Sequence, residues 1–67
     1  MKSDKSLIGK RIITDRQVIV NGISLKSKPL MVVSVYEGGL SFLLNKKIYE
    51  LKEKEFDFFQ VMDYENR

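Results

Sequence analysis

The side chains best suited to catalysis are missing from this 67-residue chain, which contains no His and no Cys. His is the commonest general acid–base group and Cys the strongest common nucleophile, so both chemistries lose their usual residues. The available Ser and Thr hydroxyls are Ser3, Ser6, Thr14, Ser24, Ser27, Ser34 and Ser41. Only Lys or a carboxylate could activate them, and the adjacent Ser27 and Lys28 are better explained by turn chemistry. The sequence therefore predicts that the protein is not an enzyme.

Metal and cofactor sites are not indicated either. Without Cys or His, only Asp and Glu oxygens remain as metal ligands. Glu55 and Asp57 are neighbouring acids of the kind that are usually solvated, and the acids near the C-terminus lack EF-hand spacing. The segment EGG at 37–39 lacks the Lys-Ser/Thr of a phosphate-binding loop. We expect no cofactor and no metal.

Charge is the strongest remaining signal. Residues 1–36 carry seven Lys or Arg against two Asp, whereas residues 37–67 carry five against seven acids. A basic half can attract nucleic acid or an acidic protein, although ordinary surface solubility explains it too. If the loop at 15–29 folds over the first strand, five cations would form one patch, and an exposed Tyr36 could stack on a base. The candidate partner-binding residues are Lys10, Arg11, Arg16, Lys26, Lys28 and Tyr36.

Short apolar runs separated by turn signals predict a small all-β domain. The run at 30–36, LMVVSVY, is apolar on both faces, which is typical of a covered central strand. Asn21-Gly22 favours a hairpin or a kink inside the long loop, and Pro29 keeps residues 26–29 out of regular structure. EGG and Asn45-Lys46 read as turns that would join a three-stranded meander over 30–51. The expected strands are 10–14, 30–36, 40–44 and 47–51.

The charged segment that follows has two interpretations. As a helix over 50–62, it would pair Glu50 with Lys54 at i, i+4. As a 3₁₀ turn followed by a strand in 57–62, it would place Phe59 and Val61 on one face. We prefer the turn and strand, because Phe and Val favour strands and few good helix formers follow Phe56.

This order resembles a small SH3-like barrel: five strands, a long first loop, and a 3₁₀ turn before the last strand. The resemblance is carried by IGKRIIT, by NGISLKSKPLMVVSVYEGGLSFLLNKKIYELKEKEF and by the strand after it, over residues 8–62. The segment NKKIYELKEKEF is similar to the ending of short SH3-like proteins of bacteria and phages. The chain departs from peptide-binding SH3 domains because it has no Trp and its first loop is basic. Recognition of proline-rich peptides is therefore not implied.

We expect one domain over 7–63, flanked by a flexible N-terminus at 1–6 and a flexible C-terminus at 64–67. The expected core is Ile12, Leu25, Val33, Val35, Phe42, Leu44, Tyr49, Leu51, Phe56, Phe59 and Val61. A barrel this small can bury only one face of 30–36 deeply, so the other must be covered by the long loop, by a partner or by a second copy.

The sequence thus predicts a small non-enzymatic binding module, an accessory or regulatory protein that acts on a protein partner as a monomer or homodimer. Nucleic-acid binding through the basic first half is the alternative. A cytoplasmic location with no membrane partner is expected, because no apolar run reaches about 20 residues and the N-terminus has no signal-like apolar stretch.

Overall fold

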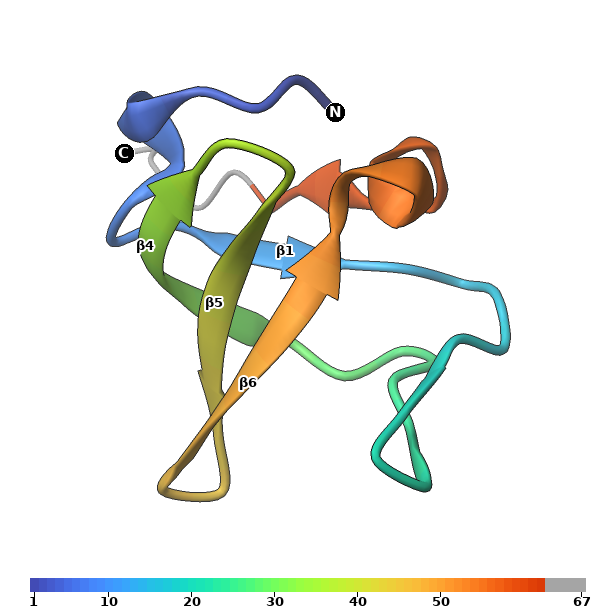
Figure 1. Ribbon diagram of the computed structural model, residues 1–67. Helices are drawn as coiled ribbons and strands as arrows, with labels where there is room; N and C mark the ends of the chain where they lie inside the picture. The colour runs from blue at the N-terminus through green and yellow to red at the C-terminus, as the bar shows by residue number, and fades with distance from the viewer. Residues whose placement is uncertain (63–67) are drawn as a thin grey trace.

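The computed structural model describes residues 1–62, which form a five-stranded antiparallel sheet and a separate two-stranded hairpin (Figure 1). The five-stranded sheet has the order β6-β5-β4-β1-β7. Its strands are β1 (Arg11–Ile13), β4 (Leu30–Tyr36), β5 (Gly39–Leu44), β6 (Lys47–Lys52) and β7 (Gln60–Val61). The hairpin consists of β2 (Ile19–Val20) and β3 (Ile23–Ser24), and two 3₁₀ helices are present, η1 (Lys5–Leu7) and η2 (Glu53–Phe58). The all-β class is confirmed.

The three-stranded meander is confirmed, because β4, β5 and β6 follow one another through turns of two residues. Asn45 and Lys46, between β5 and β6, have φ values of 53° and 69°. Two successive positive φ values are the signature of a type I′ turn, whose twist matches that of the strands it joins. In the turn from β4 to β5, Gly38 takes a φ of 91°, which favours a residue without a Cβ.

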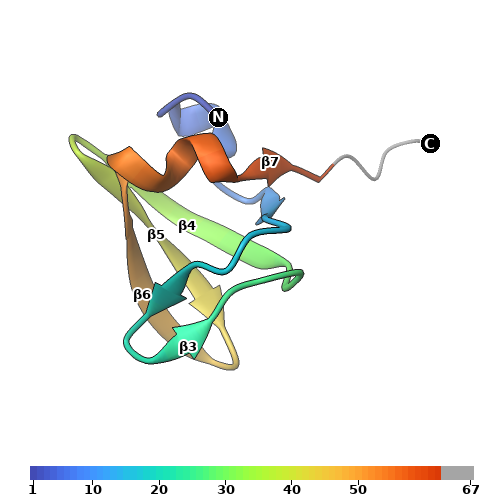
Figure 2. The ribbon, with the colours of Figure 1, turned by 90° about the vertical axis from the view of Figure 1, so that its right-hand side faces the viewer.

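The long loop contains a hairpin rather than a kink. Asn21 and Gly22 both have positive φ, and Leu25 donates its backbone N–H to the Val18 carbonyl at 2.8 Å, extending the pairing beyond β2 and β3. The hairpin lies across one face of the meander (Figure 2). Val18 and Leu25 are buried there, and Val20 and Ile23 pack against the core. The loop residues 15–29 therefore supply one wall of the core.

The interpretation of 50–62 as a 3₁₀ turn followed by a strand is confirmed, and the helix alternative is wrong. η2 spans six residues and buries Phe56, and Phe59 directly after it is also buried. β7 is shorter than the expected strand and pairs with β1, with Ile12 opposite Val61. Within residues 1–62, β6 and β7 are the two edges of the sheet and do not pair with each other, so the sheet is not a closed barrel.

Most of the expected core is buried. Ile12, Leu25, Phe42, Leu51, Phe56 and Phe59 are fully buried, and Val35, Leu44 and Tyr49 are partly buried and pack against them. The residues that complete the core without having been predicted are Leu7, Val18, Leu30, Val32 and Leu40.

Two expected core residues, Val33 and Val61, are exposed, by 37% and 40% respectively. The pairing of β4 with β5 shifts register between Val32 and Ser34. This bulge inserts Val33 as an extra residue, so the core face passes from Val32 to Val35 and Val33 is left out. Val61 lies in a two-residue edge strand, where β1 is its sole strand neighbour in the described chain.

The N-terminal residues 1–6, expected to fray, include the start of η1. The Asp4 carboxylate accepts a hydrogen bond from the Ser6 backbone N–H at 3.0 Å, and this bond holds the pKa of Asp4 below its usual value. The short helix presents Leu7 to the core, where it is 5% exposed. The expected C-terminal tail, 64–67, and the expected last domain residue, Asp63, lie outside the described residues.

Candidate interaction surface

Three of the five candidate cations gather around Thr14, just after β1. The Thr14 hydroxyl accepts a hydrogen bond from the Arg16 backbone N–H, and its carbonyl accepts one from Ser27 at 2.7 Å. Thr14 also forms a bridge to Lys26. These backbone contacts bring Arg16, Lys26 and Lys28 to the same end of β1. The Arg16 guanidinium lies 4.9 Å from the centre of the Phe58 ring, so this cation is engaged with an aromatic side chain of η2.

The other two cations, Lys10 and Arg11, lie at the opposite end of β1. The Lys10 carbonyl accepts from the Val32 backbone N–H at 2.9 Å, and Arg11 pairs with Met31 of β4. The structure therefore divides the five expected cations into two groups, one at each end of this strand. The long loop does fold beside β1, but it brings only its own cations and Arg16 together.

Tyr36 stands at the end of β4 beside the turn to β5 and is 40% exposed. Its hydroxyl donates a hydrogen bond to the Leu40 carbonyl at 3.1 Å. Partial desolvation and the nearby negative charge of Glu50 raise the pKa of Tyr36 above its ordinary value. Its ring packs across the sheet over Gly39 and is tied to β5, away from both groups of cations.

The face of the meander that turns away from the hairpin is called the outer face, and it carries Met31, Ser34, Tyr36, Ser41, Leu43, Ile48, Glu50 and Lys52. Met31 lies opposite Leu43, and Leu43 lies opposite Ile48. These three residues form a continuous apolar row across β4, β5 and β6. Leu43 is 39% exposed and Ile48 is 58% exposed, so the row is open to solvent at its β5 and β6 positions.

The row is bordered by polar groups. The hydroxyls of Ser34 and Ser41 are hydrogen-bonded to each other, and Ser41 lies opposite Glu50. The hairpin packs on the other face, where it covers Phe42 and its neighbours, and so it does not cover the apolar row. The sequence left three possible coverings for the second face: the long loop, a partner or a second copy. The long loop covers only the inner face, which is the face of the meander opposite the outer face. The alternation in 40–44 and 47–51 could have indicated which residues face away from the core, but the row itself depends on how the three strands pair.

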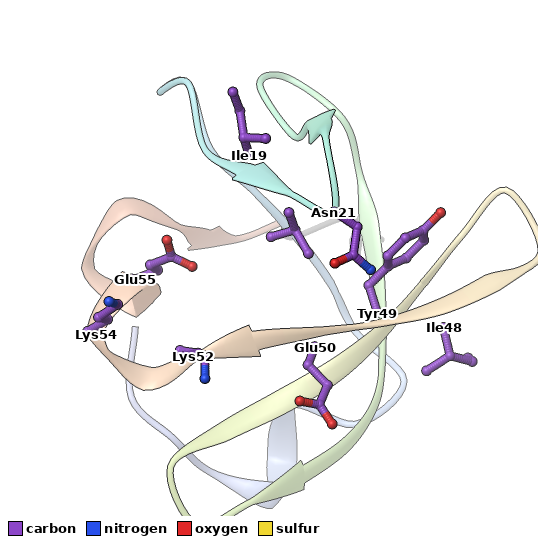
Figure 3. Close-up of a pocket in the computed structure, with 9 residues that line it drawn as sticks. Ile19, Asn21, Ile48, Tyr49, Glu50, Lys52, Lys54 and Glu55 are labelled. Atoms are coloured by element: carbon purple, nitrogen blue, oxygen red, sulfur yellow. The ribbon is translucent and has the colours of Figure 1, made fainter.

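A groove of about 470 Å³ runs between the hairpin and β6 (Figure 3). Ile19, Val20 and Asn21 line it from the hairpin, and residues 48–50, 52, 54 and 55 line it from β6 and η2. The Tyr49 side chain points toward the hairpin, whereas Ile48 and Glu50 point to the other side of β6. The Tyr49 ring is stacked on Phe42 with 5.6 Å between the ring centres, which fixes the floor of the groove.

Within residues 1–62, no cluster of three or more acidic side chains is placed to hold a metal ion. Over the same residues, neither 3₁₀ helix has the length and apolar character that crossing a membrane would require. No family model, curated protein sequence or solved structure matches the chain.

Proposed function

We propose that the protein is a non-enzymatic binding module that docks a protein partner on its outer face. The observation that carries this proposal is the apolar row of Met31, Leu43 and Ile48, which crosses three strands and which residues 1–62 leave exposed at its β5 and β6 positions. Contiguous exposed apolar surface bordered by polar groups is typical of protein-binding sites. The serine pair and Glu50 supply that border.

The row suits a protein more than a nucleic acid. Nucleic-acid surfaces combine cations that track the phosphate backbone with aromatic rings that stack on bases. On the outer face, Tyr36 lies beside the acidic Glu50, and the three cations held around Thr14 lie outside the meander. Nucleic-acid binding stays the alternative prediction, and the same experiment tests it.

The experiment is affinity capture with the wild-type protein and a Leu43→Lys/Ile48→Lys variant. Both side chains are exposed, so we expect the variant to keep its fold, which circular dichroism checks. A matched control, Lys46→Gln/Lys47→Gln, changes the net charge by the same amount in the opposite direction, in and beside the adjacent turn, without touching the row. We expect a protein captured by the wild type and the control to be lost from the row variant.

Identical capture by all three proteins would contradict docking on the outer face. Capture of nucleic acid that weakens steeply as salt rises would instead support the alternative. Light scattering of the same three proteins shows whether the partner is a second copy, because only the row variant should then become monomeric.

We also propose that the fold is SH3-like. Its support is the order of the elements: a long first connection from β1 to β4, the β4–β6 meander, the 3₁₀ helix η2 and a short last strand beside β1. A solution structure of the full chain that places β7 elsewhere than beside β1 would refute this assignment.

A further inference from the structure

The outward edge of β6 carries main-chain groups that have no partner in the described chain. The two residues that flank a two-residue type I′ turn form a hydrogen-bonded pair, so Leu44 and Lys47 exchange main-chain N–H···O=C bonds. In an antiparallel ladder every second pair is bonded in this way, which here means Phe42 with Tyr49 and Leu40 with Leu51. The Glu53 N–H donates to the Gly38 carbonyl at 2.9 Å, and this pair is the next hydrogen-bonded one in the same alternating series. Ile48 and Glu50 therefore direct their N–H and C=O groups away from β5.

No hydrogen bond of residues 1–62 outside the strand ladders uses these four groups. Unpaired edges of this kind are templates for another strand.

The opposite wall of the groove is also a strand edge. The Val18 carbonyl bonds to Leu25 on the β3 side, and Val20 pairs with Ile23 at the turn. By the same alternation, Ile19 of β2 directs its main-chain groups away from β3. The groove of about 470 Å³ thus lies between the edge of β6 and the hairpin, with Tyr49 at its floor (Figure 3).

We propose that this groove binds an extended segment of a partner protein, which adds to β6 as an antiparallel strand and pairs with Ile48 and Glu50. This second site shares Ile48 with the apolar row, but it uses the main-chain groups of Ile48 at the edge of β6, whereas the row uses its side chain. Main-chain pairing supplies affinity in such strand addition, and alternate side chains supply specificity. The antiparallel direction is favoured because every other pairing in the sheet has it.

The side chains of β6 define what the added strand should carry. The outer face of β6 presents three side chains in order along the strand: the apolar Ile48, the acidic Glu50 and the basic Lys52. Cross-strand pairs favour opposite charges and matched apolar groups. The partner segment should therefore place an acidic residue opposite Lys52, a basic residue opposite Glu50 and an apolar residue opposite Ile48. The residues between them should be apolar, since they face Leu51 and Tyr49.

A second copy of this chain fits the groove less well than a single strand. A twofold axis between two β6 edges would run perpendicular to the sheet and keep both inner faces on the same side. Each copy would then bring its own β2–β3 hairpin to the shared edge, where the first hairpin already lines the groove. A lone extended segment carries no such obstacle.

The probe is the acetylated, amidated hexapeptide Glu-Val-Lys-Val-Ile-Thr, whose first residue would lie opposite Lys52 and whose last would lie opposite Lys47. It is titrated into the isotope-labelled full chain and followed by amide chemical shifts. We expect saturable shifts centred on Ile48 and Glu50 and slower hydrogen exchange at these two amides. A scrambled hexapeptide of the same composition should not saturate. No saturable shift at about 5 mM peptide would overturn the proposal, because a Kd of 1 mM would then be visible.

N-methylation of the peptide separates strand addition from other modes of binding. The third and fifth residues direct their N–H groups at β6, and methylation of either should weaken binding about tenfold or more. The second and sixth residues direct theirs away, so their methylation should change the Kd less than about threefold. Equal losses at all four positions would exclude an added strand, and this comparison needs no change to the protein.

Variants of the protein supply a second measurement. Glu50→Pro removes one outward N–H, a change that edge strands tolerate, whereas Glu50→Ala keeps that donor. We expect Glu50→Pro to lose peptide binding. We expect Glu50→Ala to keep binding but to lose the preference for a basic peptide residue opposite position 50. The Leu43→Lys/Ile48→Lys variant keeps the main-chain N–H and C=O groups that point away from β5. It should therefore still bind the peptide, and N-methylation of the third or fifth peptide residue should still weaken that binding. A result that contradicts docking on the outer face therefore does not contradict strand addition to β6, and a result that contradicts strand addition does not contradict docking on the outer face.

Discussion

Substitution of Gly39 by Ala tests how closely β5 and β6 approach. Gly39 is buried at the start of β5, opposite Lys52 of β6 and Tyr36 of β4. A Cβ built at this position would lie 2.6 Å from the backbone oxygen of Leu51 and 3.3 Å from Cε1 of Tyr36. Because the first contact is with a backbone atom, relief requires β6 itself to move.

The expected cost follows from these contacts. Overpacking against groups that cannot rotate away costs about 1–3 kcal/mol. The smaller conformational entropy of Ala in the unfolded chain returns about 0.4–1 kcal/mol. We therefore expect Gly39→Ala to lower the free energy of unfolding by about 1–2 kcal/mol, which in a domain of this size corresponds to a Tm lower by about 4–16 °C.

The neighbouring Gly38 provides a matched control whose cost has a different origin. A Cβ there meets nothing within 4 Å, but φ is 91°. Ala at position 38 is therefore penalised by its backbone conformation alone, and Asn, which tolerates left-handed geometry, should be the better replacement. At position 39 the order should reverse, because Asn is larger than Ala. Urea unfolding followed by far-UV circular dichroism measures all four variants.

Two results would refute this reasoning. One is a Gly39→Ala protein within about 0.5 kcal/mol of the wild type, the usual range for substitutions that meet no obstacle. The other is a Gly39→Asn protein more stable than Gly39→Ala, because the closest contact, to Leu51, would then not limit side-chain size.

Two further predictions concern β4. Val32→Ala should cost about 2 kcal/mol because Val32 is 1% exposed, whereas Val33→Ala should cost less than about 0.5 kcal/mol; equal losses in urea unfolding would contradict the bulge. The second concerns Tyr36, whose pKa is raised above the ordinary 10.0 by partial desolvation and by Glu50. The folded state therefore holds the phenol proton more tightly, and this stabilisation is complete below about pH 10 and is lost as pH rises through the raised pKa. Unfolding free energies of Tyr36→Phe between about pH 8 and 11 should fall less steeply than those of the wild type, and parallel curves would show that Tyr36 does not contribute.

The strands and turns of the meander were predictable because each has a strong local cause. The run LMVVSVY forms β4 with the expected bounds, and Asn45-Lys46 forms the expected turn after β5. Of the expected turn at 37–39, Glu37 and Gly38 form the turn, whereas Gly39 begins β5. Asn21-Gly22 indicated the hairpin for the same reason, since both residues accept positive φ at low cost. Local conformational preference was sufficient at all of these positions.

The bulge was not predictable, because it depends on how two strands fit together. A single sequence shows alternation along β4, but the register shift after Val32 arises only when β4 pairs with β5. One inserted residue exchanges the faces of all the residues that follow it in the strand. Val33 is the inserted residue, so it does not share the core face with Val35 as expected. The burial of Leu7 was missed for a different reason, although Asp4 and Ser6 form a local side-chain-to-backbone turn that could have indicated η1.

The candidate site was predictable only in its residue types. The charge of the first half suggested one basic patch, but tertiary structure places its cations at both ends of β1. The exposed row and the open edge of β6 depend on which strands become neighbours, and a sequence pattern does not contain that information. Alternation did indicate that a second apolar face existed and needed a covering.

The place of β1 between β4 and β7 also sets the order in which the molecule can fold. The meander pairs residues close in sequence and needs little loop-closure entropy. β1 instead pairs with residues far from it in the sequence, since Ile12 lies opposite Val61. During synthesis, one side of β1 therefore stays unpaired until β7 has been made. We therefore expect the meander to form first and the pairing of β1 with β7, which depends on long-range contacts, to complete the sheet late in folding.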